Sequence, residues 1–229
     1  MNWIINFLTS SIGKKIIMSL TGLFLISFLP VHLLGNLQLM AGDGGEAFNT
    51  YAYFMTNNPL IKLTAYGLYF FILLHAAQGI LIAVKNKSAK GASYKVNTYK
   101  NKSWASNNMA LLGILIFAFI CIHMGDFWFK MKFTNQMAII DTYPGFEGIG
   151  VKDLYTKVSA SFSQLWIVIV YLIGLLALGF HLVHGFASAF QTLGLNHKKY
   201  TPLIKIIGYA YSVLIPLGFA IIPIWMYFK

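Results

Sequence analysis

Arginine is absent from this sequence of 229 residues, cysteine occurs once, and there are only six acidic residues. The lone Cys121 excludes an intramolecular disulfide, and because no Cys-x-x-Cys-His word is present, there is no attachment site for a c-type haem. Charged residues make up 10% of the chain, well below the roughly one quarter found in a soluble domain. With 58% hydrophobic residues, this composition indicates an integral membrane protein without a soluble domain.

The positive charge of the chain comes entirely from 17 lysines, which give a formal net charge of +11. On a soluble protein such an excess would favour nucleic acid as a partner. In a chain with so few polar residues it instead indicates how the membrane segments are oriented, because lysine-rich loops stay in the cytoplasm. We therefore expect membrane lipids, and no nucleic acid, among the partners.

Five apolar segments are long enough to cross a bilayer, and they predict an all-α membrane protein with one domain over residues 1–229. Residues 1–13 predict an interfacial helix, and 48–58 a short surface helix. The first segment continues through His32 without a small-residue cleavage site, which excludes a signal peptide. The fourth exceeds the roughly 20 residues that a bilayer requires, so we expect it to tilt or project beyond the membrane. The predicted spans are approximately 15–40, 60–84, 105–129, 159–193 and 203–228.

The distribution of charge predicts the orientation of these spans. The N-terminus and the loops 85–102 and 194–205 fall on one side of the membrane and hold 11 of the 17 lysines. This bias predicts a cytoplasmic N-terminus and an external C-terminus. The acidic residues all fall on the opposite side or at its margin, and they are Asp43, Glu46, Asp126, Asp141, Glu147 and Asp153.

Four histidines lie inside the apolar segments, where an imidazole is costly unless it has a partner. At a rise of about 1.5 Å per residue, and with helices that alternate in direction, His32 and His123 fall near the outer surface. The same measure places His75 and His181 near the inner surface. The sequence therefore predicts an outer pair and an inner pair, each contributed by two different helices.

Paired imidazoles from facing helices are what a bis-histidine b-type haem requires, because the iron takes axial ligands on both faces of the ring. Gly79 and Gly185 each follow a histidine by four residues and lie on the same helix face, where a flat macrocycle needs room. We predict two b haems stacked within the bundle. Their predicted axial ligands are His32, His75, His123 and His181.

Other interpretations of the histidines stay open at this stage. A buried histidine is often a hydrogen-bonded packing residue, and two imidazoles per level would make a poor closed metal site without haem. His184, one turn from His181, is an alternative ligand, a partner of a haem propionate or quinone, or a hydrogen-bonded neighbour. His197 lies in a basic loop and is expected to be solvated. A transporter that relays protons through histidines is a further alternative, although no acid lies deep in a span and no inverted repeat is visible.

Several short motifs occur in a specific order along the chain. They are His32-Leu33-Leu34-Gly35-Asn36, Gly45-Glu46-Ala47-Phe48-Asn49, Leu74-His75-Ala76-Ala77-Gln78-Gly79-Ile80, Ile122-His123, Phe180-His181-Leu182-Val183-His184-Gly185 and Thr201-Pro202. In this order and spacing the chain resembles the di-haem cytochrome b subunit of succinate:quinone oxidoreductases, the b558-type membrane anchor of succinate dehydrogenases and fumarate reductases. The resemblance covers nearly the whole chain.

The resemblance implies a bacterial cytoplasmic (inner) membrane protein that passes electrons between partner subunits and a quinone without itself oxidising succinate. His75 and His181 would hold the haem proximal to the cytoplasm, and His32 and His123 the distal haem. A flavoprotein subunit and an iron–sulfur subunit would dock on the cytoplasmic face, and the quinone would be menaquinone. Whether the complex forms a higher oligomer stays open. Rivals are a di-haem subunit of another respiratory dehydrogenase and an anchor that has lost its haem.

Overall fold

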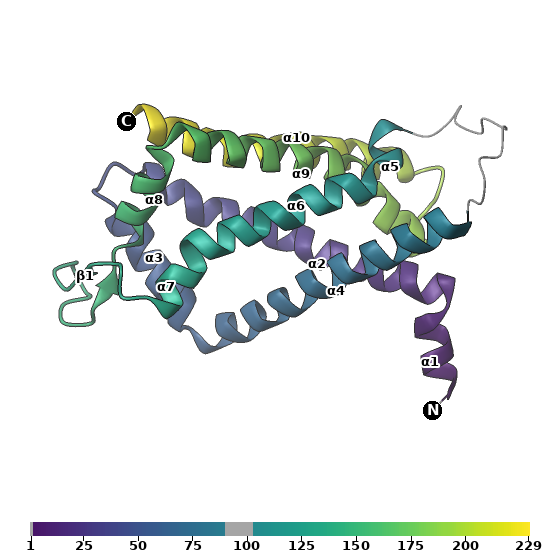
Figure 1. Cartoon of the computed structure of the whole chain (residues 1–229), viewed down its shortest axis with the longest axis horizontal. Coiled ribbons are helices and arrows are strands. Elements are labelled where there is room, and N and C mark those ends of the chain that lie inside the picture. The colour runs from purple at the N-terminus through teal and green to yellow at the C-terminus, as the bar shows by residue number, and fades with distance from the viewer. Residues whose placement is uncertain (1, 90–102) are drawn as a thin grey trace.

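The computed structural model describes residues 2–89 and 103–229 of the chain. Five long helices form an elongated bundle, and the two termini lie at opposite ends of it (Figure 1). All five are long and apolar enough to cross a membrane, so the chain is a multi-pass membrane protein. Most of the predicted lysine-rich loop 85–102 lies outside the described residues.

The five long helices follow the predicted spans closely. The first is α2 (Ser11–Leu37), which continues into a 3₁₀ turn, η1 (Gln38–Met40), and the second is α4 (Pro59–Ala89). The third span consists of α6 (Met109–His123), a π-helical turn η3 (Met124–Phe129) and α7 (Lys130–Phe133). The last two are α9 (Leu165–Thr192) and α10 (Thr201–Phe228).

Shorter elements close the two ends of the bundle. The predicted interfacial and surface helices are present as α1 (Asn2–Thr9) and α3 (Glu46–Asn57), and α5 (Trp104–Asn107) precedes α6. The connection between α7 and α9 contains a small antiparallel hairpin, β1 (Ile139–Ile140) and β2 (Val151–Lys152), followed by α8 (Leu154–Phe162).

Two predicted spans are interrupted where the sequence suggested continuous helices. The fourth was expected over 159–193, but α8 ends at Phe162, Gln164 has extended backbone, and α9 starts at Leu165. The Ser163 hydroxyl donates to the Ala160 carbonyl, so a polar run satisfies its groups locally instead of continuing the helix. The resulting span of 28 residues needs less tilt than the predicted one. The third span is likewise broken at Asn108, whose side chain donates to the Trp104 carbonyl.

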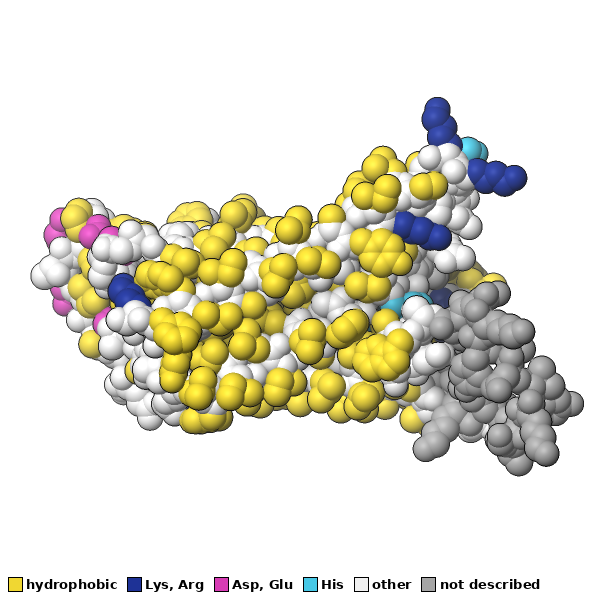
Figure 2. Space-filling model, turned by 90° about the horizontal axis from the view of Figure 1, so that it is seen from above, with side chains coloured by type: hydrophobic (Ala, Val, Ile, Leu, Met, Phe, Trp, Pro, Cys, Tyr) yellow, Lys and Arg dark blue, Asp and Glu magenta, His cyan; other side chains and the backbone are white. Residues whose placement is uncertain are grey.

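The two ends of the bundle differ in their charged residues. All six acidic residues lie at or near one end, which we call the acidic end, and Figure 2 shows the acidic side chains gathered there. The other end, here the lysine-rich end, carries Lys14, Lys15, Lys85, Lys198, Lys199 and Lys205.

Packing is uneven along the bundle. The largest group of buried apolar side chains lies at the acidic end, where α8 packs against α9 and α10, and α3 packs against α8. The lysine-rich half has a small cluster of Ala105, Leu112 and Ala177. Of the α4 side chains that the structure describes, only Leu68 is buried. Helix α4 therefore contributes little to the buried core of the described residues.

Asn49 of α3 links this helix to the hairpin region and to the start of α8, so its substitution should reduce the stability measurably. Its side chain is buried, donates to Tyr143 and Asp153, and accepts the Tyr155 backbone N–H at 2.8 Å. Asn49→Ala should lower the free energy of unfolding by about 3 kcal/mol, because it leaves a buried N–H without a partner. Thermal denaturation in detergent measures the effect.

Asn57→Ala is the matched control, because the exposed Asn57 amide bonds only the Tyr53 carbonyl of its own helix. It should change the stability by less than about 0.5 kcal/mol. Equal effects of the two substitutions would contradict the role of Asn49.

Candidate functional site

The structure places His32 of α2 beside His123 of α6, near the acidic end. Their ring centroids are 5.8 Å apart and the rings are nearly perpendicular. His32 Nδ1 lies 3.3 Å from the Asn36 amide nitrogen, and His123 Nδ1 lies 3.2 Å from the Tyr171 hydroxyl of α9. These two histidines are called the acidic-end pair below.

A second pair lies nearer the lysine-rich end. His75 of α4 and His181 of α9 have ring centroids 6.2 Å apart. His75 Nδ1 lies 3.0 Å from the Thr21 hydroxyl of α2, whereas His181 Nδ1 is buried and has no hydrogen-bond partner in the described part of the chain. This is the lysine-end pair, and the two pairs are the ones that residue depths predict.

Helices α2 and α9 each contribute a side chain to both histidine pairs. On α2, Thr21 supports the lysine-end pair, and His32, eleven residues or about 16 Å further along, belongs to the acidic-end pair. On α9, Tyr171 supports the acidic-end pair, and His181 belongs to the lysine-end pair. Each of these helices therefore supplies one imidazole to one level and one hydroxyl to the other.

The hydrogen bonds of Thr21 determine which nitrogen of His75 carries the proton. The Thr21 hydroxyl lies 2.8 Å from the Ile17 carbonyl and 3.1 Å from the Met18 carbonyl, and its single proton is donated there. Towards His75 the hydroxyl can then only accept, so the His75 proton is on Nδ1. The lone pair of Nε2 is left free for a metal ion.

Gly22 brings the backbone of α2 close to the His75 ring. A Cβ atom at this position would lie 3.2 Å from His75 Cε1, closer than side chains normally approach. The Thr21-Gly22 pair thus holds His75 by a hydrogen bond and by close contact. Sequence reasoning missed Thr21, Gly22 and Tyr171; the available signal was a hydroxyl residue in each of two apolar segments that also contain a predicted ligand.

Aromatic side chains fix the rings of the acidic-end pair. His32 stacks on Phe28 at a centroid distance of 5.1 Å, and His123 contacts Phe119 and Phe127. Across both pairs, every hydrogen bond that the described residues make to the rings involves Nδ1. The arrangement orients the imidazoles while leaving their Nε2 atoms without a protein partner among those residues.

The spacing within each pair fits one metal ion held between two imidazoles. With metal–nitrogen distances of about 2.0–2.1 Å, two such rings have centroids about 6 Å apart. Among residues 2–89 and 103–229, no three His, Cys, Asp or Glu side chains gather around a common point. Two protein ligands per level suit an ion whose remaining ligands come from a macrocycle. A Cβ atom at Gly185 would meet open space, which leaves room beside His181.

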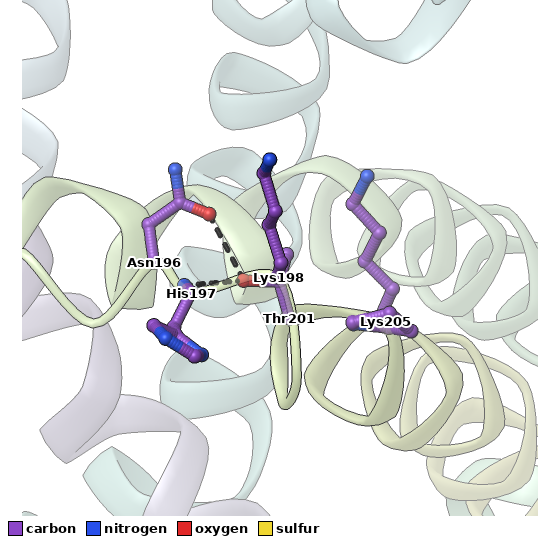
Figure 3. Close-up of a pocket in the computed structure, with 6 residues that line it drawn as sticks. Asn196, His197, Lys198, Thr201 and Lys205 are labelled. Atoms are coloured by element: carbon purple, nitrogen blue, oxygen red, sulfur yellow. Dashed lines mark hydrogen bonds between the residues drawn. The ribbon is translucent and has the colours of Figure 1, made fainter.

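The remaining histidines lie outside the two pairs. His184 Nε2 lies 3.3 Å from the Ser188 hydroxyl on the same helix, which is the contact of a hydrogen-bonded neighbour. His197 is exposed at the lysine-rich end and lines an open pocket of about 500 Å³ formed by the loop after α9 and the start of α10 (Figure 3). That pocket contains no residue of either histidine pair.

An ion cluster lies three residues beyond His123, on the π-helical turn. Asp126 accepts from Lys130 at 2.7 Å and from Lys157 of α8 at 2.8 Å, and its second oxygen accepts from the buried Ser161 hydroxyl at 2.8 Å. The cluster joins the third span to α8. It keeps the only acidic residue of a membrane-length helix among the described residues in contact with two cations.

Comparison with protein-family models, with curated proteins and with solved structures finds no match to this chain. A function can therefore be inferred only from the geometry of the histidine pairs and from the motifs of the sequence.

The Asp126 cluster predicts a second effect on stability. Asp126→Asn should reduce the free energy of unfolding by about 1–2 kcal/mol, because two half-buried lysines lose their counter-charge while water still screens part of the effect. Chemical denaturation in micelles measures it. Glu147→Gln, in an exposed turn, is the control and should have almost no effect; a similar loss in both variants would argue against the cluster.

Proposed function

We propose that this chain is the di-haem cytochrome b membrane anchor of a succinate:quinone oxidoreductase. The observation that carries the proposal is the presence of two histidine pairs at two levels of one membrane bundle, each with a centroid separation near 6 Å. In this proposal electrons pass through the membrane between a soluble iron–sulfur subunit and a quinone.

The axial ligands of the two haems would be the histidines of the two pairs. Haem iron supplies one-electron redox chemistry when bound. The chain contributes the ligands, their orientation and an apolar environment. Thr21 accepts from His75 Nδ1, which makes that imidazole a stronger donor at Nε2. His181 Nδ1 has no comparable support among the described residues, so the two ligands of the lysine-end pair differ in basicity.

Charge supports an orientation for the complex. The lysine-rich end would face the cytoplasm of a bacterium, with the lysine-end haem proximal to the flavoprotein and iron–sulfur subunits. The acidic-end haem would be distal, and the quinone, expected to be menaquinone, would react close to one of the two. The histidine geometry supports a di-haem subunit in general, and the order of the motifs favours the succinate and fumarate class over other respiratory dehydrogenases.

A visible spectrum with pyridine haemochrome quantification tests the proposal directly. The purified chain should contain two b haems. His75→Ala or His181→Ala should remove one of them, and His32→Ala or His123→Ala the other, because each pair loses an axial ligand. Absence of haem from well-folded protein would contradict the proposal and favour a histidine-relay transporter.

His184→Ala serves as the control for this series. Because His184 bonds only Ser188 among the described residues, its removal should leave both haems in place. Loss of a haem from this variant alone would instead identify His184 as the ligand on α9.

Thr21 predicts a selective change at one haem. Thr21→Val keeps the shape of the side chain but removes the acceptor for His75 Nδ1, so the proximal haem should bind about 10–100-fold more weakly. Its midpoint potential should rise, because a less basic imidazole stabilises the oxidised iron less. Potentiometric titration and haem retention after detergent washing measure both effects.

Two further variants distinguish this effect from general damage to the bundle. Thr21→Ser keeps the hydroxyl and should behave nearly as the wild type. Tyr171→Phe removes the corresponding hydroxyl at the acidic-end pair and should alter only the distal haem. Equal changes at both haems in either Thr21→Val or Tyr171→Phe would refute the assigned positioning roles.

A further inference from the structure

Polar side chains of the loop after α9 and of the first turns of α10 line an open surface pocket of about 500 Å³ at the lysine-rich end. Figure 3 shows the terminal nitrogens of Asn196, Lys198 and Lys205 directed to the same side of the pocket, while the His197 ring turns away from them. The pocket therefore presents two cations and an amide to whatever enters it. Its volume is in the range of sites for small ligands or headgroups.

A closed set of hydrogen bonds fixes which way the Asn196 amide points. The Thr201 hydroxyl donates to Asn196 Oδ1 at 2.9 Å and accepts the His197 backbone N–H at 2.9 Å. Because the amide oxygen is engaged with Thr201, the NH₂ group is the end that points to the same side as the lysine ammonium groups. The pocket thus offers donors, a composition that suits an anion.

The lysines of this pocket have no acidic counterpart nearby. All six acidic residues of the whole sequence belong to the acidic end of the bundle, and both ion pairs within the described residues involve Asp126. Lys198 and Lys205 are exposed. No acidic side chain of the described residues therefore compensates the positive charge at the pocket, which leaves both ammonium groups available to an external anion.

The position of the pocket relative to the bilayer indicates which anions it can meet. Helix α10 has 28 residues and spans about 42 Å, whereas the hydrocarbon layer is about 30 Å thick. About four residues at each end of α10 therefore stand in the headgroup region. Lys205 is the fifth residue of α10, at the boundary with the hydrocarbon, and the exposed side chains of Leu203 and Ile206 lie beside it.

We propose that this pocket binds the phosphate of an anionic phospholipid, with Lys198, Lys205 and the Asn196 amide as donors. The acyl chains would run along the exposed apolar surface of α10. An acidic segment of a soluble protein fits less well, because it would have to enter the headgroup layer and displace lipid. The pocket contains no residue of the two histidine pairs.

Native mass spectrometry of the full purified chain tests the site. The chain in detergent is titrated with phosphatidylglycerol, and separately with phosphatidylcholine, to obtain the dissociation constant of the first bound lipid. The wild type should prefer phosphatidylglycerol. Since one lysine near an anionic headgroup contributes a factor of about five, the variant Lys198→Gln/Lys205→Gln should bind phosphatidylglycerol about 5–25-fold more weakly. Its affinity for phosphatidylcholine should fall much less, because that headgroup carries no net charge.

Lys14→Gln/Lys15→Gln is the matched control, because it removes the same charge from the same end outside the pocket. It should retain at least half of the wild-type affinity, and an equal loss in both double variants would overturn the pocket in favour of a diffuse surface charge. Inorganic phosphate is the second probe. Binding of phosphate to the lipid-free chain as tightly as phosphatidylglycerol would overturn the lipid and assign a free anion. A wild-type chain without any preference for phosphatidylglycerol would overturn the site itself.

Discussion

An imidazole inside an apolar bundle has two nitrogen atoms to satisfy, and this fold satisfies mainly one of them. At His75 and His123 the Nδ1 atom meets a hydroxyl from a neighbouring helix. The other nitrogen, Nε2, has no hydrogen-bond partner among the described residues and is the atom available to a ligand. Helices α2 and α9 reach both levels, and each supplies an imidazole to one and a hydroxyl to the other.

The hydroxyls of Thr21 and Tyr171 affect the properties of the pairs as much as the histidines do. A ligand without support could rotate or exchange its proton between nitrogens, and its affinity for a metal would fall accordingly. Thr21 removes that freedom from His75, because its own proton is engaged by the carbonyls of the preceding turn. The two levels are supported by different groups, an aliphatic hydroxyl and a phenol, so their electronic properties are expected to differ even though both use two imidazoles.

Much of the fold could be predicted from the sequence, because membrane spans depend on one-dimensional quantities. Segment length, apolar content and the constant rise of a helix were sufficient to find five long helices and to place His32 with His123 and His75 with His181. The breaks at Asn108 and Gln164 were missed because local side-chain hydrogen bonds decide them. Thr21 and Tyr171 were missed because partners on other helices depend on how each helix is rotated about its axis, which apolar segments of nearly uniform composition do not reveal.

The uneven packing of the bundle has a consequence for how firmly each helix is held. Helices of a membrane protein insert individually and associate afterwards through close contacts between them. The acidic end has its own apolar core and the hydrogen bonds of Asn49, so this region can become ordered as soon as its helices meet. Helix α4 has a single buried side chain in its described part, and most of its contacts are with α2. A ligand that joined His75 to His181 would therefore give α4 a second attachment, to α9 on the other side of the bundle.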